Sequence, residues 1–470
     1  MIMRNIVAIA LFIVLAWVAP LRAQTPSSTA DRQLAAKVDT IAGQVLESTG
    51  VPSASVAVVQ NGRLAYAQAY GSARLEPRVA ASPEMRYAIG SVSKQFTAVA
   101  VLLLEQDGKL SLDQPVSRFL PGLTRAGEVT IGQLLSHTSG YQDFWPQDYV
   151  PPMMLKPTSP QGILDQWAKK PLDFEPGTRW QYSNTNYTIA ALIVEKVSGM
   201  PFFQFVRKRI LQPVGLQSAV DFDAGQLTSS DPTGYMRYGL GPLRPAPTEA
   251  PGWMYGAGEL AMTASDLARW DISLIEQRLL RPATYQALET EVLLKNGVGT
   301  GYGLGVDVGL QGGRRVISHS GEVSGFTAYN MVFPDDKAAV VVLTNQDAAP
   351  AAGAIGRQIG QLLFTSEDAR GESRTARARS IFEGLQKGTI DRSLFTEDAN
   401  AYFSEEALKD FASSLGPLGP VQQFVQTGQQ ERGGMLLRVY RAVFPQKTLR
   451  VWTFEMSNGK LEQYQVAPSV

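Results

Sequence analysis

The spacing of apolar side chains changes along the chain from strand-like to helix-like. From Val51 to Gly71, β-branched and small residues lie on both sides of Asn61-Gly62, a dipeptide that suits the two positive φ angles of a type I′ turn. This stretch predicts a β-hairpin. The stretch Phe96–Gln106 is apolar on nearly every face and predicts a helix buried inside the protein.

Helical patterns fill the middle of the chain, and strand patterns return after Gly301. Strands near both ends that enclose a mostly helical middle predict a mixed α/β (α+β) domain whose sheet is built from distant parts of the chain. Further helices are predicted at 131–135, 160–169, 185–197, 202–210, 265–276 and 350–364, and strands at 302–308, 315–318, 328–333 and 338–343.

The polar, Arg-rich stretch Thr365–Ser380 predicts a linker between two domains, because it is poor in large apolar residues. The predicted boundaries are a main domain at 24–365, a linker at 366–380 and a small C-terminal α+β module at 381–470. The pattern assigns no role to that module.

The N-terminus has the order of a secretory signal. Arg4 precedes an apolar run, Ile6–Ala19, and Pro20-Leu21-Arg22-Ala23 follows, which predicts a signal peptide at 1–23. The run is shorter than the ~20 residues that span a bilayer, so a signal is favoured over a retained anchor. We therefore expect a periplasmic or secreted protein without stable membrane insertion after cleavage.

Composition narrows the classes of function. The 43 Lys and Arg residues balance 43 Asp and Glu residues, which argues against nucleic acid as a partner. The absence of cysteine excludes disulfides and thiolate chemistry, and the two histidines make a histidine-rich metal centre improbable. No G-x-S-x-G elbow and no H-E-x-x-H motif occurs, so the usual signatures of an α/β-hydrolase and a zinc protease are missing.

The tetrapeptide Ser91-Val92-Ser93-Lys94 fits S-x-x-K, in which a serine hydroxyl lies one helical turn from an amine that can take its proton. Ser457–Lys460 fits the same pattern, but its central Asn458-Gly459 predicts a hairpin turn, so the pattern alone is weak. Only the first match precedes a buried helix. Burial there would desolvate Lys94 and lower its pKa.

Two other tripeptides are candidates for the same site. Tyr182-Ser183-Asn184 offers a phenol that could shuttle a proton and an amide that could orient substrate, or alternatively a core tyrosine and a helix cap. His319-Ser320-Gly321 follows a predicted strand, whose edge could offer N–H groups to an oxyanion. For His137, we favour a structural role in hydrogen bonding to loop backbone near the site.

Taken in order, these motifs resemble the serine β-lactamase-like family, which includes class C β-lactamases, low-molecular-weight penicillin-binding proteins, D-amino-acid peptidases and related esterases. The resemblance covers about Ala35 to Asn345 and implies an antiparallel sheet flanked by helices beside an all-α subdomain, with the active site in the cleft between them and no cofactor. The sequence segments that resemble the family also include residues 87–97, 134–140, 175–177 and 302–305.

The resemblance also implies the role of each site residue. Ser91 resembles the acylated nucleophile, Lys94 and Tyr182 its base pair, and Asn184 the substrate-orienting amide. The backbone N–H groups of Ser91 and Glu322 would form the oxyanion hole.

The third motif departs from the usual pattern. His319 and Ser320, ahead of Gly321, replace the first two residues of the K-T-G found in most β-lactamases and transpeptidases. A mostly neutral imidazole is a weaker anion site than a lysine, so the substitution favours an esterase or amidohydrolase.

Three hypotheses follow. The first is an exported serine hydrolase acting on an ester or amide in a small molecule or peptide. The second is a β-lactamase or a D-alanyl-D-alanine carboxypeptidase of the penicillin-binding type. The third is a non-catalytic penicillin-binding-like sensor.

Overall fold

The structure, a computed structural model, describes residues 29–311, 313–364, 371–432, 435–456 and 458–469. The predicted signal peptide at 1–23 lies outside the described residues. The chain divides between Leu362 and Leu363 into two units, each with its own hydrophobic core.

The first unit is built on an antiparallel sheet whose strand order is β3-β2-β1-β12-β11-β10-β9. The predicted hairpin is confirmed: Asn61 and Gly62 join its strands with φ angles of 52° and 71°. The β1 strand pairs with β12, nearly 300 residues later, so the sheet unites distant parts of the chain as predicted. Its strands are β1 (Ser53–Gln60), β2 (Arg63–Leu75), β3 (Arg78–Ala80), β9 (Asp307–Gln311), β10 (Arg314–Val323), β11 (Phe326–Phe333) and β12 (Ala338–Thr344).

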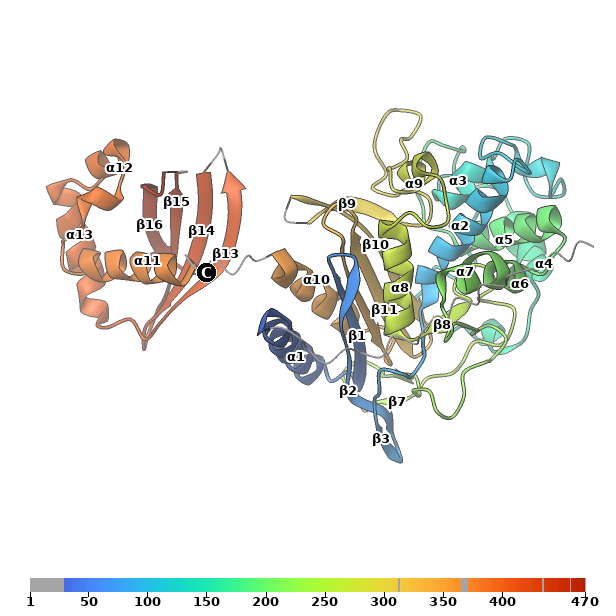
Figure 1. Ribbon diagram of the computed structural model, residues 1–470, viewed down its shortest axis with the longest axis horizontal. Helices are drawn as coiled ribbons and strands as arrows, with labels where there is room; N and C mark the ends of the chain where they lie inside the picture. Colours follow the sequence, from blue (N-terminus) through green and yellow to red (C-terminus); the bar gives the residue numbers. More distant parts are fainter. Residues whose placement is uncertain (1–28, 312, 365–370, 433–434, 457, 470) are drawn as a thin grey trace, which may run out of the picture. The chain divides into compact units, whose positions relative to one another are not determined.

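Helices cover both faces of this sheet, as Figure 1 shows, with α8 (Ala264–Ile275) on one face and α1 (Thr29–Thr49) and α10 (Ala351–Phe364) on the other. A helical region continues beyond α8 around the buried helix α2 (Lys94–Gln106). This region contains α3 (Ile131–Leu135), α4 (Pro160–Ile163), α5 (Asn184–Ser198), α6 (Phe202–Val206), α7 (Gln212–Val214) and α9 (Pro282–Leu288), with short strands β4 (Tyr87–Ala88), β5 (Val220–Asp221) and β8 (Leu260–Met262). The short strands β6 (Tyr235–Met236) and β7 (Arg244–Pro245) pair with each other at the end of the main sheet, where Tyr235 bridges Gln346 just after β12.

One hydrophobic core joins the sheet to the helical region. The α2 helix is buried along most of its length, and the ring of Phe96 stacks on Trp270 of α8 at 4.3 Å between centroids. The buried helix predicted at Phe96–Gln106 is confirmed and starts at Lys94. Its burial places the amine of Lys94 inside the protein rather than in solvent.

No single helix in the described ranges is long and apolar enough to cross a bilayer. Together, α5 and the segment Phe202–Val214 have the length and apolar composition of a membrane span, but the two helices are bent by 73° relative to each other.

Two strand predictions near the site need correction. Residues 302–306 form a turn rather than a strand, closed by the Gly303 N–H donating to the Val306 carbonyl at 2.8 Å, and β9 begins only at Asp307. The strand predicted to end at Ser318 continues to Val323, because its later residues pair with β11. His319-Ser320-Gly321 therefore lies within β10 rather than after it.

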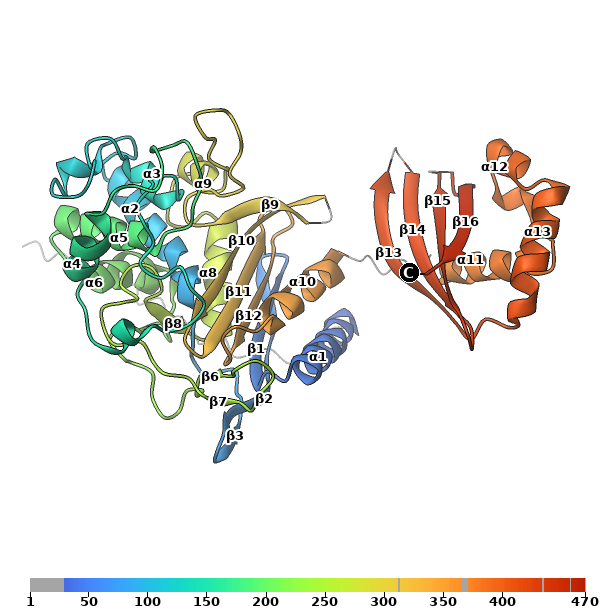
Figure 2. The same cartoon turned by 180° about the vertical axis from the view of Figure 1, so that it is seen from behind.

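The second unit packs helices against a four-stranded antiparallel sheet, with α11 (Gly371–Leu385) lying across the strands (Figure 2). The linker predicted at 366–380 is wrong from Gly371 onward, because these residues begin α11, whose Ala378 and Ile381 are buried in the core. Residues 366–370 of that prediction lie outside the described residues. The other elements are α12 (Glu397–Tyr402), α13 (Glu405–Leu415), β13 (Gln423–Arg432), β14 (Met435–Val443), β15 (Thr448–Glu455) and β16 (Leu461–Pro468).

Candidate active site

The three sequence motifs meet at a cavity of about 630 Å³ between the helical region and the edge of the sheet. The cavity is lined by residues from the turn before α2, the loops at 143–150 and 180–184, the segment 254–258 and strand β10. Ser91, Tyr182, Asn184, His319, Ser320 and Glu322 are among them.

Ser91 lies in a 3₁₀ turn, η1 (Gly90–Ser93), which leads directly into α2. Gly90 has a φ of 49°, and a Cβ there would lie 2.6 Å from the Glu322 amide nitrogen. On the facing strand, a Cβ at Gly321 would lie 1.9 Å from the carbonyl oxygen of Ile89. These two glycines let β10 approach the serine closely, so the backbone amides of Ser91 and Glu322 lie near each other.

Lys94 is buried at 0% exposure, one helical turn after Ser91. Its Nζ donates to Ser91 Oγ at 2.9 Å, to Asn184 Oδ1 at 2.8 Å and to the Ala257 carbonyl at 2.9 Å. Burial lowers the pKa of Lys94 to about 7, and the nearby charge of Asp143 opposes this shift. A large fraction of the amine is therefore neutral near pH 7 and able to accept a proton.

Tyr182 lies beside both Ser91 and Lys94. Lys94 Nζ lies 4.9 Å from the centroid of its ring, and its hydroxyl is hydrogen-bonded to Ser91. Burial raises the pKa of Tyr182 well above its ordinary value, and the bond to Ser91 opposes this only in part. Tyr182 is therefore a neutral hydroxyl near pH 7, which can donate a proton or relay one.

Asn184 is fixed by Asp143, a residue that the sequence motifs do not include. Asp143 Oδ1 accepts the Asn184 backbone N–H at 2.9 Å, and its Oδ2 accepts from the Asn184 side-chain amide at 3.3 Å. The amide then presents its oxygen to Lys94. No local pattern marks Asp143, because it meets Asn184 only through the tertiary fold.

His319 is held as a neutral ring. Its Nε2 contacts the Tyr302 hydroxyl at 2.9 Å, and its Nδ1 contacts the carbonyl of Ser320. Because a carbonyl can only accept, Nδ1 carries the proton and Nε2 accepts from Tyr302. Burial and the charge of Lys94 lower the pKa of His319 to about 3. The imidazole therefore adds no positive charge to the cavity near neutral pH.

His137 has the structural contact that the sequence predicts. It is fully buried, and its Nδ1 accepts the Ser183 backbone N–H at 3.1 Å. Its ring lies 4.3 Å from that of Tyr182 and 5.0 Å from that of Tyr302. The imidazole thus fixes the loop that carries Tyr182 and Asn184.

The other S-x-x-K match has a different setting in the second unit. Asn458 Oδ1 accepts the Lys460 backbone N–H at 3.0 Å in the turn between β15 and β16, as expected for a hairpin. Ser457 lies outside the described residues. Across the part of the chain that the structure describes, no group of three His, Cys, Asp or Glu residues could hold a metal ion.

Comparisons with known proteins cover most of the chain. A family model described as Beta-lactamase matches residues 38–363. The putative penicillin-binding protein PbpX of Bacillus subtilis is 28% identical over 313 residues, which are 66% of this chain and 75% of that protein.

Solved structures have the same fold. A D-stereospecific amidohydrolase from Streptomyces is 27% identical with a TM-score of 0.58, over 67% of this chain and 96% of that one. The octameric penicillin-binding protein homologue from Pyrococcus abyssi is 22% identical with a TM-score of 0.63, over 93% of this chain and 96% of that one. The second match extends into the C-terminal unit.

Proposed function

The chain belongs to the Beta-lactamase family, and from that premise we propose that it is an exported serine hydrolase that forms an acyl-enzyme at Ser91 and hydrolyses an ester or amide. The observation that carries this proposal is the 2.9 Å hydrogen bond between Ser91 Oγ and the buried amine of Lys94. An amine whose pKa is held at about 7 is matched to general-base work at neutral pH.

Acylation begins when the neutral Lys94 takes the proton of Ser91 and Oγ attacks the carbonyl carbon of the substrate. The negative charge that develops on the carbonyl oxygen is stabilised by the backbone N–H groups of Ser91 and Glu322. As the tetrahedral intermediate collapses, Tyr182 donates its hydroxyl proton to the leaving group and recovers one from the Lys94 ammonium. The products are an ester on Ser91 and a protonated leaving group.

Deacylation repeats these steps with water as the nucleophile. The Lys94 amine, neutral again, takes a proton from water through Tyr182, and hydroxide adds to the ester carbonyl. Expulsion of Ser91 Oγ, which recovers the proton, releases the acid. Asn184 orients the substrate through its side-chain amide and is itself held by Asp143.

The neutral His319 favours substrates without a carboxylate at that end of the cavity. In this chain the ring replaces the lysine of K-T-G, and both of its nitrogens are engaged in hydrogen bonds. A β-lactamase or D-alanyl-D-alanine carboxypeptidase is the second candidate, favoured by the similarity to a penicillin-binding protein of Bacillus subtilis. Export to the periplasm or the medium is proposed from the signal-like residues 1–23.

Covalent labelling tests the proposal. The wild-type protein, Ser91→Ala and the matched control Ser457→Ala are treated with a fluorophosphonate, a fluorescent penicillin and chromogenic short-chain esters, and adducts are located by mass spectrometry. We expect labelling and ester turnover in the wild type and in Ser457→Ala but not in Ser91→Ala. Serine-independent turnover, or none, would refute the acyl-enzyme. Stable penicillin labelling without esterase activity would favour the second candidate.

A further inference from the structure

The first turn of α2 is polar, although the helix is buried along most of its length. Its buried polar residues are Ser93, Lys94, Gln95 and Thr97, each between 0% and 2% exposed. The residues that follow, 98–104, are all apolar and buried. Burying a polar side chain costs free energy unless it forms hydrogen bonds. The turn that carries the Lys94 amine therefore needs polar partners from the rest of the fold.

Two of these side chains bind the segment that leads into β8. Ser93 Oγ accepts the Leu260 backbone N–H at 3.1 Å, and Thr97 Oγ1 donates to the Gly256 carbonyl at 2.6 Å. A serine at the start of a helix usually accepts an N–H of its own helix, whereas Ser93 accepts one from another element. Residues 256–260 thus hold the polar turn from one side.

Gln95 binds the main sheet and α8. Its Nε2 donates to Asn330 Oδ1 on β11 at 2.8 Å, and its Oε1 accepts the Trp270 indole N–H at 2.8 Å. The Asn330 amide in turn donates to Asp271 Oδ1 at 2.7 Å. These four buried side chains form the Gln95 network, which joins α2 to β11 and α8.

The Gln95 network has one possible direction. An indole N–H can only donate, so the Gln95 oxygen must face Trp270 and the Gln95 NH₂ must face Asn330. It follows that the Asn330 oxygen faces Gln95 and that its NH₂ faces Asp271. Hydrogen bonds weaken steeply with angle, whereas the hydrophobic effect is non-directional. The network therefore fixes the rotation of α2 about its own axis more sharply than apolar contacts do.

One atom of the Gln95 network is unpaired. Asp271 Oδ2 is buried and has no hydrogen-bond partner among the described residues. Burial raises the pKa of Asp271 well above its ordinary value, and the bond from Asn330 opposes this shift only in part. Buried polar atoms are normally paired, and an unpaired one is costly in a low dielectric. Stability alone therefore does not account for the network.

The rotation of the polar turn sets the distance between Lys94 Nζ and Ser91 Oγ, which is 2.9 Å. We propose that Gln95 and Thr97 are positioning residues: the Gln95 network and the bond from Thr97 to Gly256 hold α2 so that the two reacting atoms stay at hydrogen-bond distance. This inference rests on the acyl-enzyme function proposed above, because the distance affects a rate only if Lys94 is the base.

Kinetic variants test the positioning. Gln95→Met keeps the length of the side chain and removes both of its hydrogen bonds, and Thr97→Val keeps the shape and removes one. Since a small misplacement of a catalytic group is costly, we expect kcat for a chromogenic short-chain ester to fall about 10- to 100-fold in Gln95→Met and about 10-fold in Thr97→Val. KM should change by less than about threefold, because neither residue is among the described residues that line the cavity. An unchanged kcat in both variants would overturn the proposal.

Two controls separate positioning from stability. Thr97→Ser keeps the hydroxyl and should keep kcat within about twofold of the wild type. Val99 is buried on the same face of α2 as Gln95, one turn further on, so Val99→Ala removes apolar groups only. It should lower the calorimetric transition while kcat, measured well below that transition, stays close to the wild-type value. A fall in kcat in Val99→Ala as large as in Gln95→Met would show that lost packing alone explains the effect.

A matched pair at Asp271 tests the network even if Gln95→Met does not fold. Asp271→Asn keeps an oxygen to which Asn330 can donate, whereas Asp271→Leu removes it. We expect kcat to fall about 5- to 10-fold in Asp271→Leu and to be retained in Asp271→Asn, although this side chain lies two hydrogen bonds from Gln95. Equal kcat values in the two variants would refute the role of the network.

Crystal structures of the wild type, Gln95→Met and Thr97→Val separate the two proposals without turnover. We expect the distance from Lys94 Nζ to Ser91 Oγ to exceed about 3.5 Å, the limit of a hydrogen bond, in the variants. If the wild type neither reacts with a fluorophosphonate nor hydrolyses esters, a lengthened distance still supports the positioning and removes only the acyl-enzyme. If Ser91 is labelled, but distance and kcat are unchanged in the variants, only the positioning is removed.

Discussion

Two buried cations, one in each unit, show how the surroundings of a charge decide its use. Lys94 and Arg438 are 0% and 1% exposed, respectively. Arg438 donates to Glu455 at 2.9 Å, and Glu455 also binds Arg374 and Arg377 from α11. No carboxylate among the described residues lies within ion-pair distance of Lys94, whose partners are neutral oxygens.

The presence or absence of a carboxylate partner decides what each buried cation can do. Without a counter-ion, desolvation disfavours the ammonium and makes the Lys94 amine available to accept a proton. With a counter-ion, Arg438 stays charged and ties β14 to β15 and, through Glu455, to α11. The same burial therefore lowers the pKa of the cation in one unit and joins strands and helix through an ion pair in the other.

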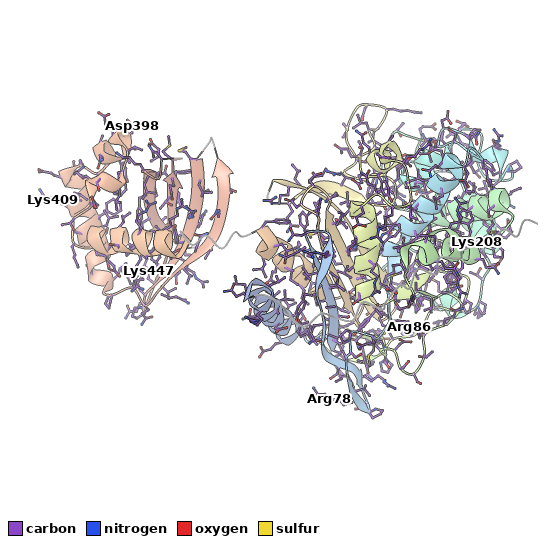
Figure 3. All side chains as sticks on the ribbon, viewed as in Figure 1. Arg78, Arg86, Lys208, Asp398, Lys409 and Lys447 are labelled. Atoms are coloured by element: carbon purple, nitrogen blue, oxygen red, sulfur yellow. The ribbon has the colours of Figure 1, made fainter. Side chains whose placement is uncertain are left out.

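The strongest way to break this comparison is to remove the unpaired cation. In Lys94→Met the general base is lost, and we expect kcat/KM for a chromogenic ester to fall about 10³-fold. Steady-state kinetics measure the loss. The matched control is Lys208→Met at an exposed position in the helical region (Figure 3), which should keep wild-type rates. A Lys94→Met enzyme with more than a tenth of the activity would disprove the role of the amine.

Removing Glu455, the counter-ion of Arg438, tests the role of the ion pair in the second unit. Glu455→Gln leaves three guanidinium groups around one neutral amide, and breaking such a buried pair costs about 3–5 kcal/mol. We expect the calorimetric transition of the second unit to move to lower temperature while ester hydrolysis is unchanged. Asp410→Asn, at an exposed position on α13, serves as control. An unshifted transition would show that the ion cluster does not hold the unit together.

A second cation placed in the cavity sharpens the comparison. His319→Lys exchanges a neutral ring for an amine in the wall of the cavity. We expect KM to fall about 10-fold for esters with a carboxylate on the leaving group, since an ion pair in a partly desolvated site contributes on the order of 1.4 kcal/mol. Michaelis–Menten kinetics on matched neutral and anionic leaving groups decide the matter, and an unchanged KM would contradict the role given to His319.

The smallest effect concerns the nearest charge to Lys94. Because the neutral amine is the active form, kcat/KM should fall as the pH drops through about 7. The charge of Asp143 raises the pKa of Lys94, so Asp143→Asn should lower that pKa and move the acid limb to lower pH by roughly one unit. A pH–rate profile gives the midpoint, with Asp410→Asn as control. If the acid limb of the profile moves to higher pH in Asp143→Asn, the charge of Asp143 does not raise the pKa of Lys94.

The sequence predicts best where a local pattern and its tertiary setting agree. Asn61-Gly62 specifies its own turn, and the apolar residues on nearly every face of α2 are enough to predict its burial. The family resemblance is confirmed by the model that matches residues 38–363. The structure also brings Ser91, Lys94 and Tyr182 together, as the family resemblance implies.

Features that depend on distant partners could not be predicted in this way. Asp143 and Tyr302 act through Asn184 and His319, which the fold brings close to them. The polar start of α11 resembled a linker because its arginines have no apolar periodicity. Arg374 and Arg377 form ion pairs with Glu455 on β15, about 80 residues later. These ion pairs hold α11 against the sheet, and a hydrophobic pattern could not predict them.

The pairing of β1 with β12 sets the order of events during synthesis. Residues 54–59 lie against residues 339–344 in the middle of the main sheet, so the ribosome must release most of the chain before that sheet can close. Long-range pairing of this kind delays folding. Until then the nascent polypeptide lacks its central ladder, and β1 can pair only with its neighbour in sequence, β2.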